Sequence, residues 1–461
     1  MSDLASAPPA PPLSRGRHRL LLLVIGLAGF VTTLDNTVVT VALPTVQAEL
    51  GTSLAALEWV VTGYVLTFSG LMLAGGRLAD VHGRRRMLVA GLAVFTAASL
   101  AAGLASSTGA LVAARLVQGC GAALILPAML AVVSVGNDER RRSAGVAVWM
   151  ASGAGALALG PVVGGYLTQH AHWSWIFLLN VPLGVLLIAL TAVVVPETRD
   201  ERAVRVDAPG VVSSVVVLSA GTFALTFGTE LGWTSPPVLA AAVLSAAGAV
   251  AFAVAERTGR DPMVDLALFR ARAFTGGVLA QVLWGLGVNG VFFFTALFLQ
   301  GVLGFTPVMS GLAFVPLALL VVVVTPLAPL AERRFGAART VALGLVLVAA
   351  GMVAVAFLRP GDGWAGLLPA VCVIGIGSAL TMPLGSAVLG AVPESRAGVA
   401  GGVFSVAREM SGLFGIALVG VIVNGSASFT AGYSAGLLVA ACLVAVGAVV
   451  SLVTLPRRSA R

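Results

Sequence analysis

Fourteen stretches of about 20 predominantly apolar residues follow one another along the 461-residue chain, and they constrain its fold more than any other feature. A helix needs about 20 apolar residues to cross the hydrocarbon core, whereas a strand of a transmembrane barrel needs about 10 of alternating polarity. Apolar residues make up 58% of the chain and charged residues only 10%, against about 25% in an average soluble domain. The sequence therefore predicts an all-α, polytopic membrane protein and excludes a soluble fold.

The predicted transmembrane helices cover residues 20–43, 57–76, 87–105, 110–135, 143–168, 174–195, 209–228, 236–256, 273–299, 307–331, 340–358, 365–391, 398–424 and 433–455. Residues 1–18 are rich in Pro, Ala and Ser, which predicts a disordered N-terminal segment. The first apolar stretch follows Arg residues, as in a signal peptide, but it continues to Leu43 and thirteen more stretches follow. We therefore expect an uncleaved first helix.

All 27 basic residues are Arg, and their positions orient the chain. Twenty-four lie in the termini and in every second loop, and Arg359 alone lies in the remaining loops. Cytoplasmic loops carry an excess of basic residues, so this division predicts a cell-membrane protein with both termini in the cytoplasm. The formal charge of +8 then reflects topology, and nucleic acid is not an expected partner.

Short sequence matches recur at offsets of 253 and 256 residues. Gly119–Pro127 resembles Gly375–Pro383, and Ala144–Ala147 is repeated as Ala397–Ala400. Such a repeat predicts a transporter built of two six-helix bundles, with a substrate site between them near the middle of the membrane. The expected units are the N-terminal segment (1–18), an N-terminal six-helix bundle (19–200), two inserted linker helices (205–260), a C-terminal six-helix bundle (270–456) and a cytoplasmic tail (457–461).

A segment rich in Gly and Arg connects the second and third predicted helices. Gly83 permits a tight turn with positive φ, and Asp80 can pair with or cap a neighbouring helix. An Arg cluster that only sets topology is the alternative, although the spacing of this segment is more specific. We interpret the segment as a latch that holds one conformation at the cytoplasmic side, formed by Gly76, Asp80, Gly83, Arg84 and Arg85.

Two charged residues lie within predicted helices of the first half. Arg115 is in the fourth helix, and its counterpart in the repeat is Val371, so packing alone does not require Arg there. Asp35 lies roughly 15 residues into the first helix, about 23 Å along it, and should face a cavity or a polar partner. We expect Arg115 to hold a nearby acid ionised and Asp35 to sense protons or a cationic substrate. A structural acid that braces a neighbouring helix is the alternative for Asp35.

A second pair of charges, Arg408 and Glu409, lies near the middle of the thirteenth predicted helix. Glu409 is a candidate proton or cation site. Burying an acidic side chain in the membrane costs free energy, so acids at such positions usually have a functional role. An internal ion pair with Arg408 is an open alternative, although adjacent residues point about 100° apart on a helix. For Glu58 and Glu230, an interfacial position without a function is equally open.

The fifth predicted helix is rich in small residues and contains a proline. Small residues allow close packing in the membrane, and the proline should kink or loosen the helix. We interpret the stretch as a mechanical element, formed by Gly153, Gly160, Pro161, Gly164 and Gly165. Its partial likeness to a dinucleotide-binding loop is rejected, because no strand precedes it.

Catalytic and cofactor motifs do not accompany these features. The sequence contains no phosphate-binding loop, its four His lie in predicted loops or tails, and its three Cys match no metal-ligand spacing. We therefore expect no enzyme activity and no nucleotide, metal or other cofactor.

Together these motifs resemble the major facilitator superfamily, specifically its fourteen-helix drug:proton antiporter branch, over residues 18–456. The similar stretches are Gly76–Arg86, Arg115–Gly121 and Gly153–Gly165, with branch signatures at Asp35–Pro44, Trp59–Tyr64 and Trp173–Pro182. The chain departs from the family pattern at Val81 for a basic residue, Thr40 for Asn and Ser174 for Arg. Val81 weakens one expected latch contact, and none of the three removes the resemblance to antiporters.

The resemblance implies a secondary transporter that exports amphipathic, often cationic, drugs or antibiotics in exchange for protons by alternating access. A carboxylate protonated from outside would exchange its proton for substrate, and helices 1, 4 and 5 with their counterparts would line the cavity. The alternatives are a dedicated exporter of one endogenous metabolite, such as the host's own antibiotic, and, less favoured, a transporter-like sensor. The expected partners are the lipid bilayer, protons and a small substrate, and no oligomer is required.

Overall fold

The computed structural model describes residues 15–134, 139–199, 207–258, 266–359, 361–393 and 396–456. The helices are α1 (Arg15–Leu50), α2 (Leu54–His82), α3 (Arg84–Gly103), α4 (Thr108–Ser134), α5 (Glu139–His170), α6 (Trp175–Leu178), α7 (Asn180–Val194), α8 (Ala208–Leu231), α9 (Pro236–Thr258), η1 (Leu266–Arg270), α10 (Arg272–Gly301), α11 (Pro307–Ala313), α12 (Val315–Val324), η2 (Thr325–Leu327), α13 (Ala328–Phe335), α14 (Ala337–Ala356), α15 (Gly363–Leu380), α16 (Pro383–Leu389), α17 (Ala397–Asn424) and α18 (Phe429–Thr454). Within these described ranges, fourteen helical segments are long and apolar enough to cross a membrane. The predicted all-α fold with fourteen spans is confirmed.

Several helices extend beyond the apolar stretches that predicted them. Residues 15–18, expected to be disordered, form the start of α1, while residues 1–14 and the predicted tail 457–461 lie outside the described residues. The predicted connection between the second and third spans is also mostly helical, because only Gly83, with φ of 108°, separates α2 from α3. The backbone hydrogen bonds of a helix can continue beyond its apolar part. Hydropathy therefore marks the part of the helix expected to lie in the membrane, and not the ends of the helix.

Proline divides two of the predicted spans into shorter helices. The tenth span consists of α11, α12, η2 and α13, and the twelfth of α15 and α16. New helices begin at or next to Pro316, Pro326 and Pro383. Proline has no N–H and its ring collides with the preceding turn, so it favours a break at these positions. In contrast, α5 remains one helix through Pro161.

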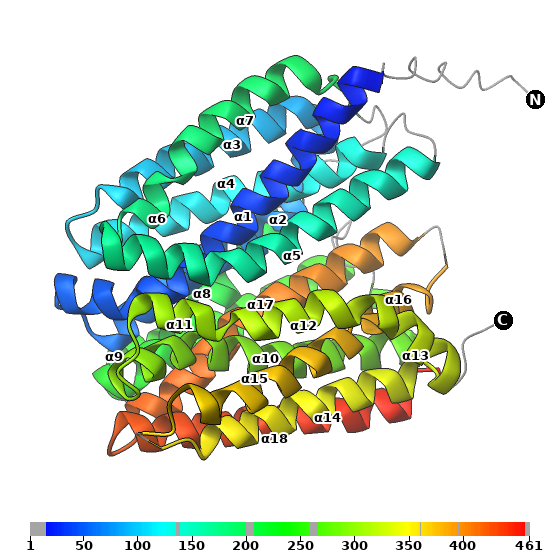
Figure 1. Ribbon diagram of the computed structural model, residues 1–461. Coiled ribbons are helices and arrows are strands. Elements are labelled where there is room, and N and C mark those ends of the chain that lie inside the picture. The colour runs from blue at the N-terminus through cyan, green and yellow to red at the C-terminus, as the bar shows by residue number, and fades with distance from the viewer. Residues whose placement is uncertain are drawn as a thin grey trace, which may run out of the picture.

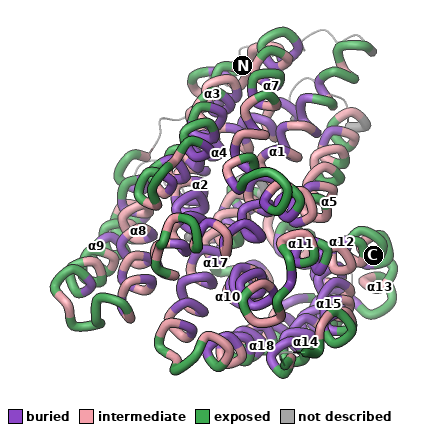
Figure 2. The backbone as a smooth tube through the Cα atoms, turned by 60° about the vertical axis from the view of Figure 1, so that its left-hand side comes forward, coloured by how far each residue is buried: buried purple, intermediate pink, exposed green. Residues whose placement is uncertain are grey.

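The spans form two bundles, α1–α7 and α10–α18, which lie one above the other in Figure 1. The inserted helix α8 packs against α2 of the first bundle and α17 of the second, while α9 packs on α8 and leaves most of its own surface exposed (Figure 2). Helix α1 begins and α18 ends at the same end of the molecule (Figure 1). We call this the terminus end and the other the opposite end.

The sequence repeat corresponds to a repeated pattern of packing. Gly119 of α4 lies against the backbone of α2, as Gly375 of α15 lies against α12. Gly121 of α4 lies against α3, as Gly377 of α15 lies against α14. Helices α1 and α5 pack together in the first bundle as α10 and α17 do in the second. The matching glycines therefore serve equivalent contacts in the two bundles.

The two bundles are joined by hydrogen bonds at the opposite end. Within the described residues, three such bonds link the bundles, one each from α1 to α10, α5 to α11 and α2 to α17. They join Val41 O to Gln300 Nε2 (2.8 Å), Gln169 Oε1 to Val308 N (3.2 Å) and Glu58 Oε1 to Asn424 Nδ2 (3.5 Å). The structure therefore has the bundles drawn together at the opposite end.

Candidate substrate and coupling site

A cavity of about 330 Å³ lies between the two bundles. Its walls come from α1, α2 and α5 of the first bundle and from α10, α12, α15 and α17 of the second, with Met382 between α15 and α16. Aromatic and aliphatic side chains dominate, including Trp284, Phe292 and Phe293 of α10. The expected contribution of helix 4 is wrong: α4 provides none of the lining residues, and it packs against α2 and α3 instead.

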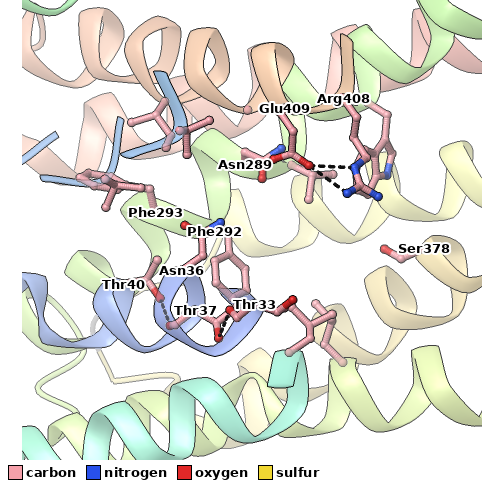
Figure 3. A pocket seen from close by; sticks show the side chains of 18 of the residues that line it. Thr33, Asn36, Thr37, Thr40, Asn289, Phe292, Phe293, Ser378, Arg408 and Glu409 are labelled. Carbon is pink, nitrogen blue, oxygen red and sulfur yellow. Dashed lines mark hydrogen bonds and ion pairs between the residues drawn. The ribbon is translucent and has the colours of Figure 1, made fainter. Parts of the chain in front are cut away.

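Helix α1 presents two polar faces to different surroundings. Asn36, Thr37 and Thr40 line the cavity, and Figure 3 shows them across it from Arg408 and Glu409. Asp35 is not among the lining residues, because the adjacent position on a helix points about 100° away. Asp35 was expected to face either a cavity or a polar partner, and it meets polar partners inside the first bundle.

Asp35 of α1 and Arg115 of α4 form an ion pair that is sealed from solvent. The distance from Arg115 Nη1 to Asp35 Oδ2 is 2.6 Å, and both side chains are 0% exposed. Gln118 Nε2 and Asn180 Nδ2 donate to Asp35 Oδ1 at 2.8 and 2.7 Å. Arg115 also donates through Nε to the Val60 carbonyl at 2.9 Å. Arg115 thus has the nearby acid predicted for it, and that acid is Asp35.

Aromatic rings and further polar groups complete this buried network. The Arg115 guanidinium lies 4.4 Å from the centroid of the Tyr64 ring, a distance at which the face of the ring attracts a cation. Arg115 Nη1 donates to Gln118 Oε1 at 2.6 Å, and Gln118 Nε2 is 2.8 Å from Ser99 Oγ. The sequence reasoning missed Gln118, Ser99 and Asn180. Of these three, Gln118 could have been predicted from the sequence, because it follows Arg115 by three residues and residues three apart share a helix face.

Arg408 and Glu409 form a second ion pair, which lines the cavity. Arg408 Nη2 and Nε contact Glu409 Oε1 at 2.9 and 3.2 Å. The side chains are 51% and 19% exposed, in contrast to the sealed pair of the first bundle. The internal ion pair that the sequence left open is therefore the one observed. Both contacts involve Oε1 and leave Oε2 of Glu409 outside the pair.

Most of the residues predicted to form a latch contact one another or the segment that follows α7. Asp80 pairs with Arg84 at 2.8 Å, and Gly83 adopts the positive φ expected of it. Glu197, which the sequence reasoning missed, accepts from the Arg85 backbone N–H at 3.1 Å. These partners all belong to the first bundle, so the contacts seen here do not join the two bundles.

The glycines of α5 differ in how closely they are packed. Gly160 and Gly164 lie against α1, and Gly165 lies against the Pro307 backbone of α11 in the other bundle. Around Gly153, the nearest described atom to the position a Cβ would take is Thr33 Oγ1 at 3.9 Å, so the expected close packing is absent there. Residues on one helix face the bundle at only some positions, and the composition of the stretch did not separate them.

The contact between α5 and α11 is reciprocal. A Cβ at Gly165 would overlap the Pro307 carbonyl oxygen, and one at Gly311 would overlap the Pro161 carbonyl oxygen. Pro161 also cannot donate to the carbonyl of Leu157, four residues earlier, and Leu157 lines the cavity. Gly76 of the predicted latch is not packed in this way: a Cβ there would lie 3.5 Å from Pro127 Cβ, an ordinary van der Waals distance. The glycines of α5 and α11 thus permit a close approach of these two helices, which belong to different bundles.

Two repeated six-span bundles with a cavity between them define the architecture of a secondary transporter. The Major Facilitator Superfamily pattern matches residues 25–416, and the chain belongs to this family of transporters, which are not enzymes.

Its relatives include proteins of drug and antibiotic resistance. The chain is 34% identical to the puromycin resistance protein of Streptomyces alboniger, over 90% of this chain and 83% of the relative. It is 35% identical to the methylenomycin A resistance protein of Streptomyces coelicolor, over 88% and 86%. It is 34% identical to the multidrug resistance protein Stp of Mycobacterium tuberculosis, over 87% and 75%.

Solved structures of other transporters share the fold. A POT family transporter in complex with 5-aminolevulinic acid aligns with a TM-score of 0.72 at 14% identity, over 95% of this chain and 96% of that one. A D-xylose-proton symporter aligns with a TM-score of 0.69 at 16% identity, over 95% and 98%. At these identities the likeness concerns the fold alone.

Proposed function

We propose that this protein exports amphipathic drugs or antibiotics from the cell in exchange for protons. The observation that carries the proposal is the cavity between the bundles, whose aromatic and aliphatic walls suit an apolar body. One carboxylate, Glu409, and a few Thr and Asn groups could bind a cationic or polar portion of the substrate. Antibiotic and drug resistance among the relatives supports the same class of substrate.

In this proposal the terminus end faces the cytoplasm, as the Arg distribution predicts, and the bundles are closed at the outside. Substrate bound from the cytoplasmic side would compete with a proton for Glu409. Its cationic group would replace Arg408 as the partner of the carboxylate. Separation of the bundles at the opposite end would then release substrate outside, where protonation of the carboxylate would favour the return. A proton gradient would thereby drive export.

Efflux from cells that express the chain tests this function. We expect a panel of cationic dyes and antibiotics to be extruded, and a protonophore to abolish the extrusion. Retention of every compound, or extrusion that a protonophore leaves unchanged, would contradict the proposal. A dedicated exporter of one metabolite is the second candidate, favoured because relatives carry the name of a single antibiotic, and export of only one compound would support it.

Replacing Glu409 by Gln should reduce efflux of cationic compounds by about tenfold or more, since the cavity would lose its acidic group. Neutral compounds should be affected less, because they depend on the apolar walls. The measurement is the initial efflux rate of matched cationic and neutral compounds, normalised to protein in the membrane. Glu332→Gln on α13 makes the same change outside the cavity and should retain the parent rate. Equal loss for neutral and cationic compounds would contradict a charge-specific role.

Orientation of the termini can be tested by cysteine labelling. In a chain from which Cys120, Cys372 and Cys442 have been removed, Ser459→Cys should not react with a membrane-impermeant reagent added to intact cells. Ser459 lies outside the described residues, and Ser106→Cys, in the exposed loop at the opposite end, is the positive control. Ready labelling at 459 from outside would overturn the proposed topology.

A further inference from the structure

Glu58 is a buried acid at the opposite end that the coupling scheme above does not use. It lies one turn inside α2, near Ser53, whose hydroxyl accepts from the Ala56 N–H and so begins the helix. The sequence left open whether Glu58 is interfacial, but its side chain is 0% exposed. It is buried because α17 of the other bundle crosses α2 here, and Gly420 of α17 lies directly against its carboxyl group.

The surroundings of Glu58 do not compensate a negative charge. Glu58 Oε1 is 3.5 Å from Asn424 Nδ2, at the limit of a hydrogen bond, and Glu58 Oε2 has no hydrogen-bond partner among the described residues. By contrast, Asp35 has a guanidinium and two amide donors, and Glu409 has Arg408. A buried charge without a partner is strongly unfavourable, whereas a protonated carboxyl group is tolerated far better.

The titratable groups on the neighbouring helices do not supply a cation. Glu230 of α8 adds a like charge nearby, and its exposed side chain accepts a hydrogen bond from Ser53. Arg115 of α4 contacts α2 through the Val60 carbonyl, but it is paired with Asp35. At the end of α1, Glu49 is bonded to His172 and Trp173. Within the part of the chain that the structure describes, closure of α2 against α17 therefore encloses Glu58 without an opposite charge.

We propose that Glu58 is a second proton site, which must be protonated for the two bundles to close at the opposite end. Separation of α2 and α17 would expose the carboxyl group to water, where it can ionise. Proton binding and closure are then linked, because each favours the other. The inference rests on the proposed function only in assigning this end to the outside, where protons would promote the return of the emptied transporter.

The distance between the bundles as a function of pH tests this linkage without measuring transport. Spin labels at Ser106→Cys and Ala427→Cys, both exposed at the opposite end, report its opening in a chain lacking the native cysteines. In nanodiscs, raising the pH from about 5 to about 9 should shift the population from short to long distances. One linked proton changes the closed-to-open ratio by up to about tenfold per pH unit.

Glu58→Gln imitates the protonated acid, so short distances should persist at high pH. The matched control is Glu230→Gln, which removes a neighbouring charge at the same end but should leave the pH response in place. An unchanged pH response in Glu58→Gln, or loss of the response in both variants, would overturn the proposal.

A second variant keeps the proposal testable if Glu58→Gln does not fold. Asn424→Arg places a cation beside the carboxylate, so the ionised form can remain enclosed and short distances should persist at high pH. Long distances at high pH in a folded Asn424→Arg protein would contradict the proposal. If these distance changes occur but a protonophore has no effect on efflux, the proposed function fails while the proton site stands.

Discussion

The Asp35→Asn variant should insert in the membrane but lose proton-driven efflux. The Asp35 carboxylate and the Arg115 guanidinium are 2.6 Å apart and fully buried, so the substitution leaves the guanidinium without its counter-charge. Breaking a buried ion pair in this way destabilises a protein by about 3–5 kcal/mol. Thermal unfolding and efflux, both normalised to membrane protein, measure the two consequences. Arg115→Ala should likewise abolish efflux, because Arg115 is the one cationic partner of Asp35 among the described residues.

A charge-neutral double variant separates coupling from support of the fold. In Asp35→Asn/Arg115→Gln both charges are removed, so the uncompensated charge of each single variant is absent. We expect the double variant to recover stability, with a coupling energy of about 0.5–3 kcal/mol in the mutant cycle, while efflux remains at background. Recovery of efflux together with stability would show that the pair only braces α1 against α4.

Gly165→Val should reduce efflux by about tenfold or more while the protein remains folded. The added side chain would overlap the Pro307 carbonyl oxygen of α11, in the other bundle. A backbone atom cannot move aside as a flexible side chain can. The contact joins different bundles, so the substitution opposes closure at the opposite end more than folding of either bundle. Efflux and the distance between labels at 106 and 427 measure the effect, and the labels should move apart.

Gly155→Val is the matched control for this prediction. It makes the same change on the same helix, but no described atom of another element lies within 4 Å of the position of a Cβ at Gly155. Parent-level efflux is therefore expected. If both variants were equally inactive, the defect would come from valine in α5 in general, and the close approach of α5 to α11 would not be its cause.

The arrangement of spans could be predicted because the membrane reduces the problem nearly to one dimension. Each span must satisfy its own backbone groups as a helix, so apolar length marks it and the Arg distribution orders the loops. The ends of the helices could not be predicted in this way: α2 runs to His82 because its polar last turns still satisfy their backbone hydrogen bonds.

The charged residues of the candidate site could be predicted one by one, but their contacts and their uncharged partners could not. Asp35 and Arg115 are recognisable because charges within a span are expensive. Their mutual pairing depends on how α1 packs against α4, which the sequence pattern does not encode. Glu58 is the clearest case, since it lies near the end of a span and its burial comes from α17, where Asn424 is 366 residues further along the chain.

The central claim is that the protein exchanges protons for substrate, and a measurement of proton:substrate antiport in proteoliposomes tests it most directly. The purified parent protein would be reconstituted with a pH-sensitive dye inside the vesicles, together with the strongest substrate found in the efflux panel. We predict that an imposed pH gradient drives accumulation of that substrate, and that a substrate gradient moves protons in the opposite direction. Asp35→Asn/Arg115→Gln should show neither. Substrate movement by the parent protein at the same rate with and without a pH gradient, and with no proton flux, would contradict the account.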